Sequence, residues 1–232
     1  MRIFPIPRGP MNLPVLSLLE TRVLGVLVEK QHTVPDTYPL TLLALTAGCN
    51  QKTSRDPIVN ASEAEVQSAV DQLRTLSLVV ESSGGRVMRY AHNVGRVLAI
   101  PSQATALVAA LMLRGPQTIG ELRINCDRLH RFADVSAVEG FLHELASRPA
   151  GGLVVELARQ PGARETRWAH LLSGPPAADV GARPAAEEAA SGAVAASEVA
   201  TLKANVAHLQ EEIAALKAVV ARLCVELGAP GP

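Results

Sequence analysis

Hydrophobic and polar positions along the chain follow helical and strand periods, in an order that occurs twice. Leu19, Val23 and Val26 recur at four- and three-residue steps, as on one buried face of a helix. By this criterion, helices are expected over residues 17–30, 40–47, 62–76, 102–114, 119–125 and 134–147. Two β-rich runs follow the third helix and two more follow the sixth, with turns at Ser83-Gly84-Gly85 and at Gln160-Pro161-Gly162.

Short sequence motifs recur between the two halves of this order. Leu78-Val79-Val80-Glu81 returns as Leu153-Val154-Val155-Glu156, and Arg89-Tyr90-Ala91-His92 returns as Arg167-Trp168-Ala169-His170. Upstream of these motifs, the residues that correspond are Pro39 with Pro116, Leu45 with Leu122, and Cys49 with Cys126. Because the matches keep their order with only loop-sized shifts, we interpret the chain as a duplication.

The helix starts and the order of elements together indicate the fold. Ser17, Ser62 and Thr118 are each followed three residues later by a glutamate, which is the spacing of a capping box. Three helices followed by a β-hairpin is the winged-helix order, with a generic α+β domain as the alternative. The predicted fold class is α+β and helix-rich, with two tandem winged-helix domains at residues 16–97 and 98–174.

The C-terminal part of the chain has a different pattern. Residues 175–196 are rich in Ala, Pro and Gly, which predicts a linker. Over residues 197–228 a heptad seam predicts a coiled-coil helix, and its members are Val199, Leu202, Val206, Leu209, Ile213, Leu216, Val220, Leu223 and Leu227. β-Branched residues at most a positions with Leu at d favour a parallel homodimer, while a helix folded back on its own body is the alternative.

The N-terminus and the cysteines indicate the compartment. Residues 1–15 are expected to form a disordered leader, and Met11 is an alternative start to Met1. The leader lacks the apolar stretch of a signal peptide, and the sequence shows no apolar run long enough to span a bilayer. Three cysteines without metal-type pairing are typical of a reducing compartment, so a cytoplasmic protein without a membrane partner is expected.

The sequence lacks the usual motifs of catalytic, metal and cofactor sites. The six histidines are scattered singly, and the sequence contains no HExxH, no paired CxxC and no glycine-rich phosphate loop. No serine lies in a nucleophile motif. The sequence therefore predicts a non-enzymatic protein with no catalytic residue, no metal site and no cofactor.

The distribution of charge bears on nucleic-acid binding. The chain has 22 basic and 22 acidic residues, and the third helix of each copy is acidic, which disfavours docking of that helix against phosphates. Basic and amide side chains instead occupy the turn before each third helix and the hairpins. The nucleic-acid-binding candidates are Asn50, Gln51, Lys52, Arg55, Arg86, Arg89, Arg123, Arg128, Arg131, Arg159, Arg164 and Arg167.

Two functional hypotheses follow from these positions. The first is a dimeric, transcription-regulator-like protein that binds double-stranded DNA through turns and hairpins. The second is a protein-protein interaction module whose acidic third helices bind a basic partner, with no DNA contact. The alternative to a phosphate-binding role for Lys52 and Arg55 is that they pair with Asp56 and with the acids of the third helix, and so hold the turn in place.

Several segments resemble a known family. They are Leu24-Gly25-Val26-Leu27-Val28-Glu29-Lys30, Tyr38-Pro39-Leu40, residues 49–57, residues 113–118 and residues 120–123. Together they closely resemble the YceH family of bacterial proteins, from about Leu16 to Gly174. The resemblance implies tandem winged-helix domains, in agreement with the pattern above, and it implies no particular biochemical activity.

Overall fold

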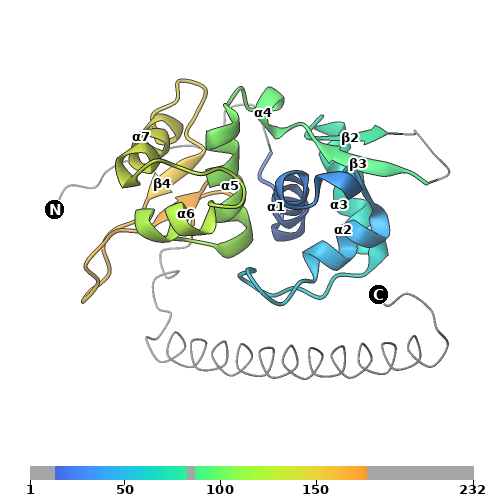
Figure 1. Ribbon diagram of the computed structural model, residues 1–232, viewed down its shortest axis with the longest axis horizontal. Helices are drawn as coiled ribbons and strands as arrows, with labels where there is room; N and C mark the ends of the chain where they lie inside the picture. Colours follow the sequence, from blue (N-terminus) through green and yellow to red (C-terminus); the bar gives the residue numbers. More distant parts are fainter. Residues whose placement is uncertain (1–13, 83–86, 177–232) are drawn as a thin grey trace, which may run out of the picture. The chain divides into compact units, whose positions relative to one another are not determined.

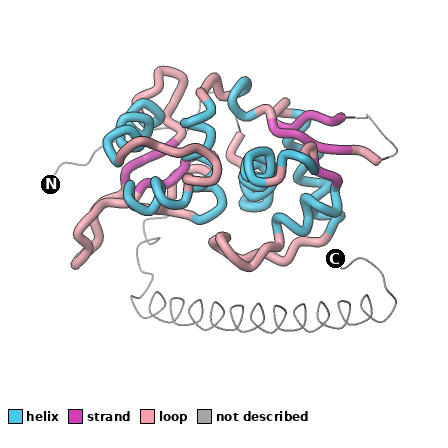
Figure 2. The backbone as a smooth tube through the Cα atoms, viewed as in Figure 1, coloured by secondary structure: helices cyan, strands magenta, loops and turns pink. Residues whose placement is uncertain are grey.

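The structure is a computed structural model that describes residues 14–82 and 87–176 (Figure 1). Arg86, the seam from Val199 to Leu227, and most of the predicted leader and linker lie outside the described residues. The described residues belong to one compact unit that runs from Met1 to Ala178. The unit is α+β and helix-rich, as predicted, with helices in cyan and two small sheets in magenta in Figure 2.

The elements follow the predicted order with a few additions. The first copy comprises α1 (Leu18–Thr33), the 3-10 helix η1 (Pro35–Thr37), β1 (Leu40–Thr41), α2 (Leu42–Cys49), α3 (Glu63–Thr75), β2 (Val79–Ser82), β3 (Arg89–His92) and α4 (Val94–Val97). The second copy comprises α5 (Ser102–Arg114), α6 (Ile119–Asn125), α7 (Val135–Ala146), β4 (Val154–Glu156) and β5 (Trp168–His170).

The predicted capping boxes are confirmed. The hydroxyl of Ser17 accepts a hydrogen bond from the backbone amide of Glu20. The side-chain carboxylate of Glu20 in turn accepts one from the backbone amide of Ser17. The same pair of bonds starts α3 at Ser62 and α6 at Thr118. The second helix of the first copy begins at Leu42 rather than at residue 40. Thr41 caps that helix, and residues 40 and 41 pair with β3 instead of continuing the helix.

Each copy has an antiparallel hairpin beside its third helix. The first sheet has the strand order β1-β3-β2, with Leu40 opposite Tyr90. The second sheet pairs β4 with β5. There the counterpart of β1 is a single bridge between Gln117 and Trp168, at the positions that correspond to Leu40 and Tyr90. The two copies therefore share a connection between the hairpin and the segment before the second helix.

The repeat extends to individual hydrogen bonds. The Asn93 amide donates to the Leu78 carbonyl at 2.8 Å, and the Leu171 amide donates to the Leu153 carbonyl at the same distance. Arg89 donates from Nη1 to the Pro39 carbonyl at 2.8 Å. In the second copy, Arg167 donates from Nη1 to the Pro116 carbonyl at 3.3 Å. Corresponding residues thus make corresponding contacts, as duplication of one unit requires.

The first helices of the two copies pack against each other, and they lie side by side in Figure 1. Gly25 makes the close approach possible, because a Cβ placed there would lie 2.8 Å from Cγ of Leu113. Every residue from Thr21 to Val28 on α1 is buried, as is every residue from Ala104 to Leu113 on α5. One continuous hydrophobic core therefore runs through both copies.

Candidate nucleic-acid interface

The turn between α2 and α3, residues 50–61, is called here the first turn, and Arg55 lies at its centre. Nη2 of Arg55 lies 2.6 Å from Oε2 of Glu29, and its side chain is 0% exposed. Its Nε donates to the Gly48 carbonyl at 3.3 Å. The side chain of Arg55 therefore does not reach solvent. The prediction that Arg55 contacts nucleic acid is wrong, because the side chain is buried.

Two further candidates of the first turn have intramolecular roles. The Asn50 amide group donates to the Ala61 carbonyl and accepts from the Ala61 amide, both at 2.8 Å. The Gln51 Oε1 accepts from Lys30 and from Arg55. These bonds close the first turn on itself and leave the Asn50 amide occupied. Lys52 is exposed and has no partner among the described side chains.

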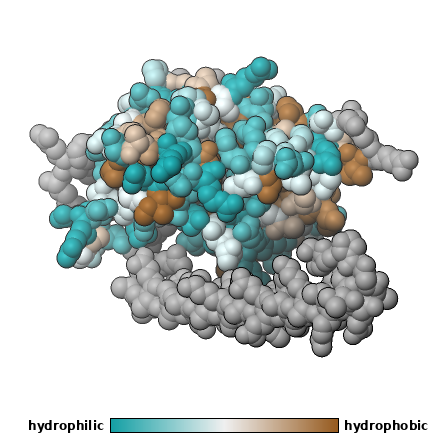
Figure 3. Space-filling model, in the orientation of Figure 1, coloured by the Kyte–Doolittle hydropathy of each residue, from teal (hydrophilic) through white to brown (hydrophobic). Residues whose placement is uncertain are grey.

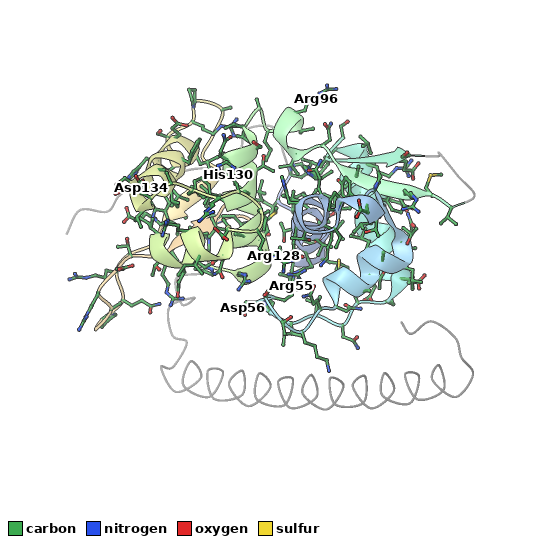
Figure 4. The ribbon with its side chains drawn as sticks, in the orientation of Figure 1. Arg55, Asp56, Arg96, Arg128, His130 and Asp134 are labelled. Atoms are coloured by element: carbon green, nitrogen blue, oxygen red, sulfur yellow. The ribbon has the colours of Figure 1, made fainter. Side chains whose placement is uncertain are left out.

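The first turn also attaches to the second copy. The Asp56 amide donates to the Leu113 carbonyl at 2.8 Å, and Nη2 of Arg114 donates to Oγ of Ser54 at the same distance. On its other side, the buried Arg22 donates to the carbonyls of Cys49 and Pro57. The first turn therefore connects the two copies through hydrogen bonds. In Figure 4, Arg55 and Asp56 lie together on this loop.

The charge of Arg55 affects the pKa values of its neighbours Glu29 and Arg22. Burial alone would raise the pKa of Glu29, but the hydrogen bonds and positive charge of Arg55 outweigh burial and hold that pKa below its ordinary value. Burial, with the nearby charge of Arg55, lowers the pKa of Arg22. Sequence reasoning paired Arg55 with Asp56 and the α3 acids and missed Glu29. The available signal was an acid near the C-terminus of α1, where the helix dipole disfavours negative charge.

The corresponding turn of the second copy, residues 126–134, is called here the second turn and is organised differently. Arg128 is exposed and forms no hydrogen bond or ion pair with residues 14–82 or 87–176. Arg131 is 90% exposed, with Nε 3.9 Å from Asp127. Arg123, on α6, donates to the Ala133 carbonyl at 3.3 Å and lines one shallow hollow together with Arg131. The second turn thus presents guanidinium groups to solvent.

The loop between β4 and β5, residues 157–167, is called here the second wing. The Leu157 amide closes its base by donating to the Arg167 carbonyl at 2.7 Å, and the Ala163 amide turns its tip by donating to the Gln160 carbonyl. Arg159 and Arg164 are exposed and have no partner in the described part of the chain. The second wing extends away from the helices of its copy in Figure 1.

The arginines at the bases of the two hairpins are structural. Arg89 donates to the Thr37 and Pro39 carbonyls. Arg167 donates to the Pro116 carbonyl, and its Nη2 lies 3.6 Å from Glu121 on α6. Each arginine thus ties its hairpin to the segment that precedes the second helix. Arg167 is still about one third exposed, so it lies at the edge of the exposed basic surface of the second copy.

The third helices are acidic in the structure as well as in the sequence. On α3, Glu63, Glu65 and Asp71 are all exposed. On α7, Glu139 lies 3.8 Å from His143, and the preceding Asp134 caps the helix. Neither helix offers an exposed basic row for phosphates. Among the described residues, the exposed arginines of the second turn, the second wing and α6 lie in the second copy, whereas the first copy exposes Lys52, Arg74, Arg89 and Arg96 at separate places.

The two thiols of the repeat are buried in the core, and its two histidines are partly buried beside it. Burial raises the pKa of Cys49 and of Cys126 to about 12, so both thiols stay protonated. Burial lowers the pKa of His92 and of His170 to about 4. Across the described ranges, no three His, Cys, Asp or Glu side chains gather as metal ligands would. In the same ranges, no helix is both long enough and apolar enough to cross a bilayer.

Comparison with known proteins finds similarity over both copies. A family model described as "Protein of unknown function, DUF480" matches residues 16–163. A UPF0502 protein of Dechloromonas aromatica is 64% identical over 169 residues, which cover 73% of this chain and 79% of that protein. A UPF0502 protein of Methylibium petroleiphilum is 60% identical over 198 residues, covering 85% of this chain and 84% of its own length. A third, from Burkholderia orbicola, is 63% identical over 174 residues, covering 75% of this chain and 73% of its own.

Proposed function

The chain belongs to the DUF480 family, and we propose that it is a non-enzymatic tandem winged-helix protein that binds double-stranded DNA through its second copy. Each copy supplies the elements of a winged helix in order, namely three helices and a hairpin. The pairing between the hairpin and the segment before the second helix also repeats. Winged-helix proteins commonly place the third helix in the major groove and the wing near the DNA backbone.

One observation carries this proposal. The second turn and the second wing expose Arg128, Arg159 and Arg164, whose guanidinium groups have no carboxylate partner among the described residues. An exposed arginine without an internal partner can bind phosphate without first breaking an ion pair. In the corresponding first turn, Arg55 is buried in its ion pair with Glu29. DNA binding is therefore assigned to the second copy alone.

The acidic α7 limits how the DNA lies. A helix that exposes Glu139 is repelled by phosphates, so deep insertion of α7 into the major groove is disfavoured. The contacts are instead made by the second turn and the second wing, on either side of α7 in the chain. Such contacts are mainly to the sugar-phosphate backbone, and they make binding strongly dependent on salt.

Dimerisation completes the proposal. The heptad seam from Val199 to Leu227 pairs two chains in parallel, so that each dimer carries two second copies. Two linked sites raise the overall affinity through effective concentration, without any new type of contact. The buried, protonated Cys49 and Cys126 suit the reducing cytoplasm, where bacterial DNA lies.

Retention of fragmented host DNA by the full-length protein, measured across a salt series, tests the proposal. The variant Arg164→Glu should weaken retention by about tenfold or more and lower the salt slope by about one to two. Its matched control is Arg96→Glu, because Arg96 is equally exposed but lies on α4, far from Arg128 in Figure 4. Equal loss in both variants, or no retention at low salt, would reject DNA binding by the second copy.

The second candidate function is a protein-interaction module. The exposed acids of α3, Glu63, Glu65 and Asp71, favour it, because they form a surface that a basic partner can bind. Capture of a defined basic protein that survives nuclease treatment would support this function. Reversal of charge at Glu63 and Asp71 should then abolish capture, whereas Arg164→Glu should not.

A further inference from the structure

Resting on the proposed DNA binding, we infer that the second wing inserts its arginines into the minor groove and prefers A·T-rich DNA. The inference concerns residues 157–167 alone and assigns them a different task from the second turn. The second turn binds phosphates, which carry no sequence information directly. The second wing recognises the width and the negative electrostatic potential of the minor groove.

The shape of the second wing suits a narrow groove. Its base is closed by the bond from the Leu157 amide to the Arg167 carbonyl, and its tip is turned by the bond from Ala163 to Gln160. Gly162, at the tip, has a φ of +83° and nothing within 4 Å of its Cβ position. The turn consists of Gln160, Pro161, Gly162 and Ala163, so it carries no aromatic or β-branched side chain. A minor groove of about 6 Å admits a projection of this kind, whereas a helix needs the major groove.

The side chains of the second wing suit the potential of that groove. Arg159 and Arg164 lie on the two flanks of the tip, and both are exposed without an internal partner among the described residues. The neighbouring charges are Glu165, which is exposed, and Glu156, which accepts a hydrogen bond from Thr166. A-tracts narrow the minor groove and strengthen its negative potential, which attracts arginine in particular. The guanidinium group is less strongly hydrated than the ammonium of lysine, so it enters the groove more readily.

The hairpin of the first copy, which comprises β2, β3 and the loop between them, exposes different side chains over its described part. Val80, Val87 and Met88 are exposed there, at 43%, 59% and 43%. They are among the scattered exposed apolar side chains of the unit, which form separate small patches on the face shown in Figure 3. Arg89 of the same hairpin is exposed, but its Nη1 donates to the Thr37 and Pro39 carbonyls, so the inference is confined to the second wing.

Binding of the full chain to three short duplexes, measured by fluorescence anisotropy at low salt, tests the inference. One duplex carries a central A·T tract, one carries G·C pairs, and one carries inosine·cytosine pairs. Inosine·cytosine resembles A·T in the minor groove because it lacks the 2-amino group of guanine, but it presents a G·C-like major groove. We expect the A·T and inosine duplexes to bind alike, and both roughly tenfold more tightly than the G·C duplex.

Variants separate groove insertion from simple charge. Arg159→Lys with Arg164→Lys keeps the charge of the wing, so phosphate binding should stay within about twofold while the preference for A·T is lost. Arg96→Lys, the matched control, should change neither. An inosine duplex that binds like G·C, or a preference that survives in the lysine variant, would overturn minor-groove insertion while DNA binding stands. No binding to any duplex would overturn both proposals.

Discussion

The carboxylate of Glu29 on α1 and the guanidinium group of Arg55 in the first turn form an ion pair at 2.6 Å in which the arginine side chain is completely buried. This pair determines what the first copy can do. It draws the first turn inward against α1, where Asp56 and Ser54 then reach the end of α5. Arg55 and Asn50 of this turn are therefore unavailable to an external ligand, whereas the second turn exposes Arg128 and Arg131.

Loss of Arg55 should be costly. Arg55→Met leaves the largely buried Glu29 with Lys30, 3.4 Å away, as its remaining ion-pair partner, so the free energy of unfolding should fall by about 3 kcal/mol. Arg74→Met is the control, because Arg74 pairs with Asp71 and Glu81 at the surface, where such pairs contribute about 0–1 kcal/mol. Urea unfolding of the full-length variants measures both. Replacing Glu29 and Arg55 together with methionine should restore most of the loss, since no buried charge is then left unpaired.

The stability of the protein should depend on two histidines at mildly acid pH. Burial lowers the pKa of His92, with a further contribution from His32, and lowers that of His170; both reach about 4. Between pH 6.5 and 4 the unfolded chain binds these protons and the folded chain does not. The free energy of unfolding is thus highest above pH 6.5. As the pH is lowered from 6.5 toward 4, it decreases by about 1.4 kcal/mol per pH unit for each histidine.

Thermal unfolding at pH 7 and pH 5 measures this effect. His92→Gln with His170→Gln should reduce the fall in Tm between the two pH values, because the titrating groups are gone. His143→Gln, at a side chain that is 60% exposed, should leave the fall unchanged. An unaltered pH dependence in the double variant would show that other groups control stability in this range.

Two glycines should respond in opposite directions to substitution by alanine. Gly25→Ala places a methyl group 2.8 Å from Cγ of Leu113, so we expect a loss of about 1–3 kcal/mol from overpacking between α1 and α5. Gly140 on α7 has nothing within 4 Å of its Cβ position. There alanine should add about 0.5–1 kcal/mol through its higher helix propensity. Denaturant midpoints compare the two variants, and a stabilising Gly25→Ala would contradict the close packing.

The predicted heptad seam can be tested in the full chain. Leu209→Lys with Leu216→Lys places charges at two d positions and should convert a dimer into a monomer. Ala204→Lys with Ala218→Lys adds the same charge on the outer face of the helix and should leave the dimer intact. Sedimentation equilibrium gives the molecular mass in each case. A monomeric parent protein would contradict the seam directly.

The sequence predicted local features well and distant ones poorly. The limits of α6 agree with the prediction, because Thr118 and Glu121 satisfy each other within one turn and can be recognised from their spacing. β1 was not predicted, because a two-residue strand exists only through its pairing with β3, nearly fifty residues further along the chain. Arg55 was misjudged for the same reason, since its partner Glu29 lies on a different helix and charge alone does not reveal burial. Arg159 and Arg164 stayed exposed as expected, because loop tips rarely find partners.

The packing of α1 against α5 gives the duplicated gene a property that most tandem repeats lack. Tandem domains with separate hydrophobic cores can fold independently of one another. Here a fragment that ends after the first copy would present the buried apolar face of α1 to water, and a fragment that begins at α5 would present that of its partner. Neither half is then a viable product on its own.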